Sequence, residues 1–349
     1  MTIHPALWLL LAACSMASGL PPAPHDMNLA TDMAEGARRF LTSLSQDQAR
    51  RGRFAIDDAE RLDWHYIPRR RPGVALGELT HAQRHLAYGF LATALDRRGL
   101  LKASAIMALE EVLHQREQGR GTFTRDAAAY FLTIFGEPST GATWGWRLEG
   151  HHVSINMTLV DGVYPRAAPV FLGAAPSVVT TGLLAGTRVL GREEELGFRL
   201  VGSLDPGQRR EAIIRATAPD DILAAPGVAL VELPGLVATR MTAAQRTLLG
   251  ALLAEIVENL PREQADRERA RLVGRGLDPL VFSWAGGIEP GKPHYFRITG
   301  PSFLYEYDNT QQGATHVHTV WHARAAVGGD FGIDLLRDHY RNHSHGAQR

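Results

Sequence analysis

Apolar residues recur along this chain with two different periods, and each period predicts a different kind of element. Residues 82–95 and 244–257 carry aliphatic side chains every three or four positions, which predicts amphipathic helices. Residues 145–156 and 295–307 combine aromatic, β-branched and glycine residues in the manner of strands joined by a turn. Helices and strands are therefore both expected in the fold.

A short pattern marks the predicted helix starts: an aliphatic residue, then Ser, Thr or Asp, then two residues, then Gln. It occurs at residues 44–48, 79–83, 204–208 and 241–245. In a capping box the Ser, Thr or Asp oxygen accepts the third backbone N–H of the helix, and the Gln side chain reaches back to the cap N–H. Each occurrence therefore predicts a helix N-terminus.

The order of these helix starts indicates an internal repeat, because each pair of starts is followed by a segment that resembles strands. When the two segments are aligned, Arg147 matches Arg297 and Gly150 matches Gly300. We therefore predict an α+β fold of two pseudo-symmetric repeats, about 29–185 and 190–322. Each repeat is expected to consist of helices followed by an antiparallel β-hairpin, and the two hairpins to pair into a shared central sheet.

Length and charge narrow the class of protein. The chain has 349 residues, of which 45% are hydrophobic and 21% charged, as in a globular domain with a buried core. Its 37 basic and 37 acidic residues cancel, so no strong field attracts a nucleic acid. We expect no nucleic-acid partner, and a single domain over residues 29–345 that ends in a C-terminal helix.

The N-terminus has the features of an export signal followed by a tether, together spanning residues 1–28. Residues 6–13 form an apolar run that is too short to span a bilayer. The sequence Leu-Ala-Ala-Cys at residues 11–14 is similar to a bacterial lipobox, in which Cys14 would be lipidated. Cleavage after Ala17 or Gly19 is the alternative, because the leader has no basic residue near its start. Both predict a periplasmic, cell-envelope or secreted protein, with membrane contact only through a lipid anchor at Cys14.

The most distinctive chemistry lies in residues 307–322, which contain His316, His318 and His322. Alternate residues of a strand share a face, so His316 and His318 are expected side by side. Paired imidazoles are good ligands for zinc, copper or iron. The only cysteine is Cys14, so thiolates of the mature fold are not expected to contribute. A histidine on a strand is nevertheless more often structural than metal-binding.

The repeat alignment supplies the remaining ligands of a predicted divalent-metal site. It places His152 and Glu306 near the pseudo-symmetry axis. The predicted ligands are His152, His316, His318 and Glu306, with Asp308 as the alternative carboxylate. Catalytic roles are predicted for Glu149 and Asp308, and substrate binding for Arg147, Arg297, Asn309 and Gln311. A local turn at residues 307–311 is the competing structural explanation for Asp308, Asn309 and Gln311.

Several collinear motifs resemble the family catalogued as domain of unknown function 3500. They lie at residues 65–76, 130–139, 144–156, 171–176, 282–287, 305–311, 316–321 and 330–340. The resemblance extends from about residue 34 to residue 340. It implies that His151, His152, His316 and His318 belong to the family pattern, whereas His322 departs from it. The family has no assigned function, so the resemblance names no reaction.

These observations favour an exported, metal-dependent enzyme that acts on a small polar substrate in a histidine-rich cleft. Zinc would favour hydrolysis, and copper or iron would favour oxidation. The alternatives are a non-catalytic ligand-binding protein of the cell envelope and a structural lipoprotein.

Overall fold

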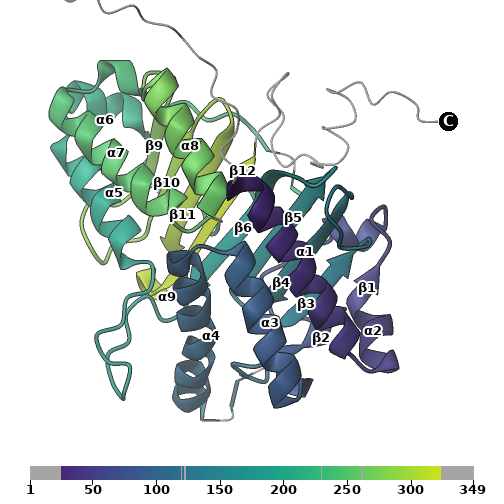
Figure 1. The fold of residues 1–349 in the computed structure, drawn as a ribbon. Coiled ribbons are helices and arrows are strands. Elements are labelled where there is room, and N and C mark those ends of the chain that lie inside the picture. Colours follow the sequence, from purple (N-terminus) through teal and green to yellow (C-terminus); the bar gives the residue numbers. More distant parts are fainter. Residues whose placement is uncertain (1–24, 119, 122, 229, 261, 324–349) are drawn as a thin grey trace, which may run out of the picture.

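The computed structural model describes residues 25–118, 120–121, 123–228, 230–260 and 262–323. The predicted export signal with Cys14, and the predicted C-terminal helix, lie outside these residues. Within them the fold is α+β, as expected from the sequence, with helices packed on one large sheet (Figure 1). Along the described residues, no helix combines the length and apolar character needed to cross a membrane.

The elements follow one another in nearly the same order in each half of the chain, except that the 3-10 helix at Ala59–Leu62 and the short helix at Gln311–Ala314 each occur in one half only. The helices of the first half are α1 (His25–Ser43), α2 (Gln46–Gly52), α3 (His81–Ala94) and α4 (Arg97–Glu117). Its strands are β1 (Arg53–Phe54), β2 (Val74–Ala75), β3 (Phe131–Phe135), β4 (Trp144–Gly150), β5 (Val153–Val160) and β6 (Val163–Ala174). Short 3-10 helices lie at Ala59–Leu62 and Leu76–Glu78.

The second half has helices α5 (Gly191–Ser203), α6 (Pro206–Ala212), α7 (Ala243–Val257), α8 (Arg262–Arg275) and the short α9 (Gln311–Ala314). Its strands are β7 (Ile213–Arg215), β8 (Leu236–Val237), β9 (Val281–Gly286), β10 (His294–Thr299), β11 (Phe303–Thr310) and β12 (His316–Ala323). A 3-10 helix at Ala238–Arg240 precedes α7.

The helix starts predicted from the capping pattern are confirmed. Capping boxes close the N-termini of α2, α3, α6 and α7, with caps at Ser45, Thr80, Asp205 and Thr242. The first described helix, α1, begins at His25, within the last residues of the predicted tether.

The sheet is larger than two hairpins. Its strand order is β1-β3-β4-β5-β6-β12-β11-β10-β9-β7, with β2 paired to β3 and β8 paired to β9. Each half therefore contributes a four-stranded antiparallel run, β3 to β6 or β9 to β12, instead of the predicted hairpin. The runs join where β6 pairs antiparallel with β12, from Val317 opposite Ala174 to Trp321 opposite Val170.

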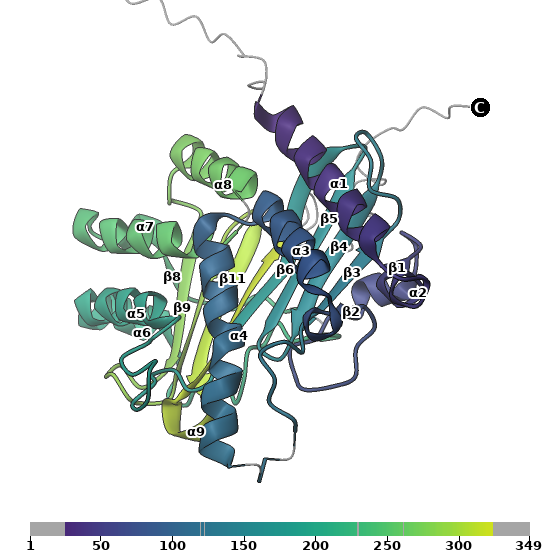
Figure 2. The ribbon, with the colours of Figure 1, turned by 60° about the horizontal axis from the view of Figure 1, so that its bottom comes forward.

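Different groups of residues pack on the two faces of the sheet. The long helices pack over one face and bury the main hydrophobic core, which includes Trp144, Trp284 and Trp321 (Figure 2). On the other face a smaller cluster forms around Trp64, Phe171 and Val320. Alternation along β12 follows this division, since Trp321 faces the helices and its neighbour Val320 faces the opposite side.

A candidate metal centre of three histidines

The face of the sheet opposite the helices is lined by buried polar side chains. They include Thr133, Arg147, Glu149, Ser154, Asn156, Ser283, Arg297, Glu306, Asp308, His318 and His322. Directly opposed residues of neighbouring strands share a face, so the register places these groups in continuous rows across the sheet. A buried polar surface of this kind must satisfy its own hydrogen bonds or bind a ligand.

One row brings histidines from both halves together at Gly173 of β6. His318 of β12 lies opposite Gly173 in the register, and His152 accepts the Gly173 N–H at its carbonyl oxygen over 2.8 Å. A Cβ atom added to Gly173 would lie only 3.0 Å from His152 Cδ2. Glycine therefore provides the space in which the two imidazoles approach each other.

The turn between β4 and β5 determines where His152 lies. His152 has a φ angle of 64°, a left-handed conformation that non-glycine residues seldom adopt. Its backbone N–H donates to the Tyr66 carbonyl over 2.9 Å, and its side chain is buried. The surrounding contacts stabilise this strained conformation, and the conformation directs the His152 ring towards β12.

The Nε2 atoms of the three rings converge. His152 Nε2 lies 2.7 Å from His316 Nε2, which in turn lies 3.1 Å from His318 Nε2. Around a tetrahedral zinc ion with Zn–N bonds of about 2.0–2.1 Å, ligand nitrogens lie about 3.4 Å apart. To share an ion, the His152 and His316 nitrogens would therefore separate by about 0.7 Å, and the His316 and His318 nitrogens by about 0.3 Å.

The hydrogen-bond roles leave an excess of lone pairs at this point. Asp221 Oδ1 lies 2.6 Å from His318 Nδ1, so Nδ1 carries the proton and His318 Nε2 presents a lone pair. At most one proton then fits between the three Nε2 atoms when the rings are neutral. At least two lone pairs face each other, an arrangement that a bound cation stabilises.

Burial keeps two of these rings, His152 and His316, neutral. The pKa of His152 is held well below its usual value by burial, and the neighbouring histidines lower it further. Burial lowers the pKa of His316 to about 3, again with contributions from nearby histidines. Neutral imidazole is the form that binds metals, so at neutral pH no proton has to be displaced from these two residues.

Asp221 orients the third ring. Burial alone would raise the pKa of its carboxyl, but the hydrogen bond from His318 lowers it below the usual value. Tyr66 Oη and Gln311 Nε2 each donate to Asp221 Oδ2 over 3.2 Å. A carboxylate that fixes the tautomer of a histidine ligand is characteristic of metal sites in proteins.

A second cluster adjoins the first through stacked rings. His151 stacks on His152 with ring centroids 3.7 Å apart. His151 Nδ1 is hydrogen bonded to Glu110 of α4, and Arg125 approaches the same nitrogen at 3.3 Å. Glu110, His151 and His152 also offer ligand atoms within 4.8 Å of one another.

The structure does not bring the predicted ligand Glu306 into the three-histidine cluster. One of its oxygens pairs with Arg297, and the other accepts the backbone N–H groups of Leu223 and Ala224 over 2.7 and 2.9 Å. Arg297 also donates to the Tyr295 hydroxyl and the Val231 carbonyl, so it is occupied as well. Glu306 and Arg297 therefore hydrogen bond to the loop after β7 and hold it against the sheet.

Glu149 and Arg147 occupy the corresponding positions in the first half. Glu149 accepts from Arg71 Nε over 2.7 Å and from the His65 N–H over 2.9 Å, and Arg147 Nε lies 3.2 Å away. Arg147 also pairs with Glu60. Both side chains are therefore engaged within the protein, and their catalytic and substrate-binding roles stay predictions.

Asp308 and Asn309 lie beside the cluster without joining its ligand atoms. Burial raises the pKa of Asp308 to about 8, so its carboxyl is protonated at neutral pH and cannot accept a proton there. Its Oδ1 accepts from the Thr310 hydroxyl over 2.7 Å. Asn309 accepts the His316 N–H over 3.1 Å, which makes it a support for the start of β12.

His322 also stays apart, as its departure from the family pattern implies. It is buried, and its Nε2 donates to the Ala224 carbonyl over 3.1 Å. Sequence reasoning missed Asp221, which lies in the loop after β7 and reaches His318 across the polar face. The Asp220-Asp221 pair was visible in the sequence, but nothing in its spacing linked it to a histidine 97 residues away.

A helix-covered sheet whose opposite face buries convergent histidines defines an α+β protein with a candidate metal centre. The chain belongs to the family described as "Protein of unknown function (DUF3500)", whose model matches residues 26–333. This match confirms the resemblance seen in the sequence. No curated protein and no solved structure shows significant similarity to the chain.

Proposed function

We propose that this protein is a metal-dependent hydrolase in which His152, His316 and His318 bind one divalent ion through Nε2. The convergence of three imidazoles on one point, with His152 and His318 buried and His316 partly buried, is the observation that carries the proposal. Three histidines leave a fourth position of a tetrahedral ion for water, and zinc lowers the pKa of such a water to about 7. The substrate would be a small polar molecule.

Metal analysis of protein purified without a histidine tag and loaded with zinc tests the proposal. We expect about one equivalent of zinc in the wild type and none in the His316→Ala, His318→Ala double variant. The matched control is His85→Ala with His114→Ala, two exposed helix residues, which should retain the ion. Absence of stoichiometric zinc from the wild type, or its retention in the cluster variant with unchanged folding, would contradict the proposal.

A second candidate is a protein that binds a metal or ligand without turnover. Two observations favour it: the protonated carboxyl of Asp308 cannot act as a base at neutral pH, and Glu149 is already paired with Arg71. Zinc-loaded protein that leaves intact a panel of carboxylic and phosphate esters of 4-nitrophenol and carboxylic anilides of 4-nitroaniline would support this candidate over the hydrolase. Copper or iron with oxidase activity is the corresponding alternative chemistry.

We also infer that the two halves are pseudo-symmetric repeats. The inference is supported by the matching element order, the central β6–β12 pair, and the register, in which Arg147 opposes Asn156 as Arg297 opposes Glu306. A rotation that superposes β3–β6 on β9–β12 without aligning the two arginines would count against it.

Finally, we propose that the protein is exported and anchored by a lipid at Cys14. The apolar run at residues 6–13 and the Leu-Ala-Ala-Cys sequence support this localisation. Intact-mass analysis of the mature protein should find a lipidated N-terminal cysteine, and Cys14→Ser should abolish the lipid. Detection of the unprocessed leader in the purified protein would exclude the proposal.

A further inference from the structure

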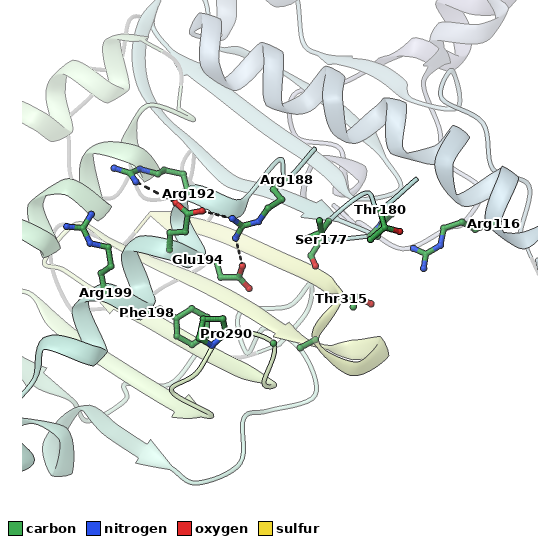
Figure 3. A pocket seen from close by; sticks show the side chains of 15 residues that line it. Arg116, Ser177, Thr180, Arg188, Arg192, Glu194, Phe198, Arg199, Pro290 and Thr315 are labelled. Carbon is green, nitrogen blue, oxygen red and sulfur yellow. Dashed lines mark hydrogen bonds and ion pairs between the residues drawn. The ribbon is translucent and has the colours of Figure 1, made fainter. Parts of the chain in front are cut away.

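A pocket of about 780 Å³ lies on the helix side of the molecule, where the linker after β6 passes between the two halves (Figure 3). Its walls come from that linker, from the C-terminal end of α4, from α5, from the loop between β9 and β10, and from the residues immediately before β12. Four arginines and two glutamates line it: Arg116, Arg188, Arg192, Arg199, Glu194 and Glu195. The pocket therefore carries an excess of positive charge.

The glutamates neutralise only part of that charge. Arg188 pairs with Glu194 over 2.9 Å and also with Glu195, while Arg192 lies 3.6 Å from Glu195. Glu194 is engaged further, because it accepts from Asn309 Nδ2 over 2.9 Å. Within the described part of the chain, Arg116 and Arg199 form no ion pair.

The rest of the lining is apolar or weakly polar. Phe198 and Pro290 contribute apolar surface, and Ser177 and Thr315 contribute hydroxyl groups (Figure 3). An arginine guanidinium recognises carboxylates through paired hydrogen bonds, and a pocket of this size and character accommodates a small molecule.

We propose that this pocket binds a small organic carboxylate, with the anionic group held by Arg116 or Arg199 and the apolar body against Phe198. The site is separate from the histidine cluster, although the two are joined by hydrogen bonds. Glu194 contacts Asn309, and Asn309 in turn holds the backbone N–H of His316. The proposal does not depend on a bound metal.

Isothermal titration calorimetry with benzoate and hexanoate tests this proposal, with benzamide and hexanamide as uncharged controls of similar shape. We expect at least one of the carboxylates to bind the wild type, and to bind the Arg116→Ala, Arg199→Ala variant at least tenfold more weakly. Both arginines are exposed, so the variant should fold. The matched control is Arg97→Ala, an exposed arginine at the opposite end of α4, which should bind as the wild type does.

Two further measurements locate the site. Arg199→Lys combined with Arg116→Lys should recover part of the affinity, since positive charge is restored without the paired guanidinium geometry. The His316→Ala, His318→Ala variant should bind the carboxylate normally, because the pocket lies outside the cluster. Failure of both carboxylates to bind the wild type, equal binding of the amides, or unchanged affinity in the double arginine variant would overturn the proposal.

Discussion

At the scale of single residues, Asp221 is the group on which the geometry of His318 depends. It holds the proton of that ring on Nδ1 and leaves Nε2 directed at His316. Its own second oxygen is fixed by Tyr66 and Gln311. The side chain is therefore suited to orient a metal ligand without itself touching the ion.

We predict that Asp221→Asn weakens zinc binding by about 10- to 100-fold, the usual effect of losing a carboxylate that supports a histidine ligand. Competition with a chelator of known affinity measures the change. Asp220→Asn is the matched control, since Asp220 is exposed and contributes only its carbonyl oxygen to Gln311. Equal zinc affinity in the two variants would show that Asp221 plays no part in the site.

At the scale of elements, the capping boxes do more than start helices. Gln245 caps α7 and also donates to the Ser203 carbonyl over 2.9 Å and to Gln208 over 2.7 Å. Gln83 makes the equivalent contacts with Ser43 and Gln48 in the first half. The recurring glutamines therefore tie each longer helix to the short helix before it.

Gln245→Ala should destabilise the protein by about 2–3 kcal/mol, because the substitution removes several hydrogen bonds and leaves the buried Gln208 amide without one of its partners. Urea denaturation measures this as a lower midpoint. Thr247→Ala on the exposed side of α7 should change stability by no more than about 0.5 kcal/mol. Similar midpoints for both variants would refute the buried-network interpretation.

At the scale of the whole molecule, the polar face makes stability depend on pH. Burial lowers the pKa of His322 to about 4, compared with about 6.5 in an unfolded chain. As pH falls below about 6.5 the unfolded state takes up a proton that the folded state resists. The stabilising contribution of neutral His322 is therefore present above this pH and is lost between about 6.5 and 4.

We predict that the free energy of unfolding falls by about 3 kcal/mol less in the His322→Gln variant than in the wild type when the pH is lowered from 6.5 to 4. The glutamine amide can still donate to the Ala224 carbonyl. Denaturant unfolding at a series of pH values measures the difference. His152 and His316 are present in both proteins, so the difference isolates His322. The exposed His85→Gln variant should follow the wild-type curve, and parallel curves for all three proteins would refute the prediction.

Much of this structure follows from local physics. The capping pattern specified the starts of α2, α3, α6 and α7, since each box satisfies its own backbone groups within a few residues. Alternation along residues 316–322 specified which histidines share a face. The alignment of the halves also selected His152 as the partner of His316 and His318.

Tertiary structure decided the rest, because it depends on contacts between residues far apart in the chain. The sequence indicated hairpins but did not reveal the outer strands, which pair across long connections. It offered Glu306 as a metal ligand and Glu149 and Asp308 as catalytic carboxylates, whereas packing enclosed the two glutamates in ion pairs and protonated Asp308. It gave no means of connecting Asp221 to His318. Residue types and their local periods fix which groups are present on a face, but only the assembled sheet and its covering loops determine which of them remain available to a ligand.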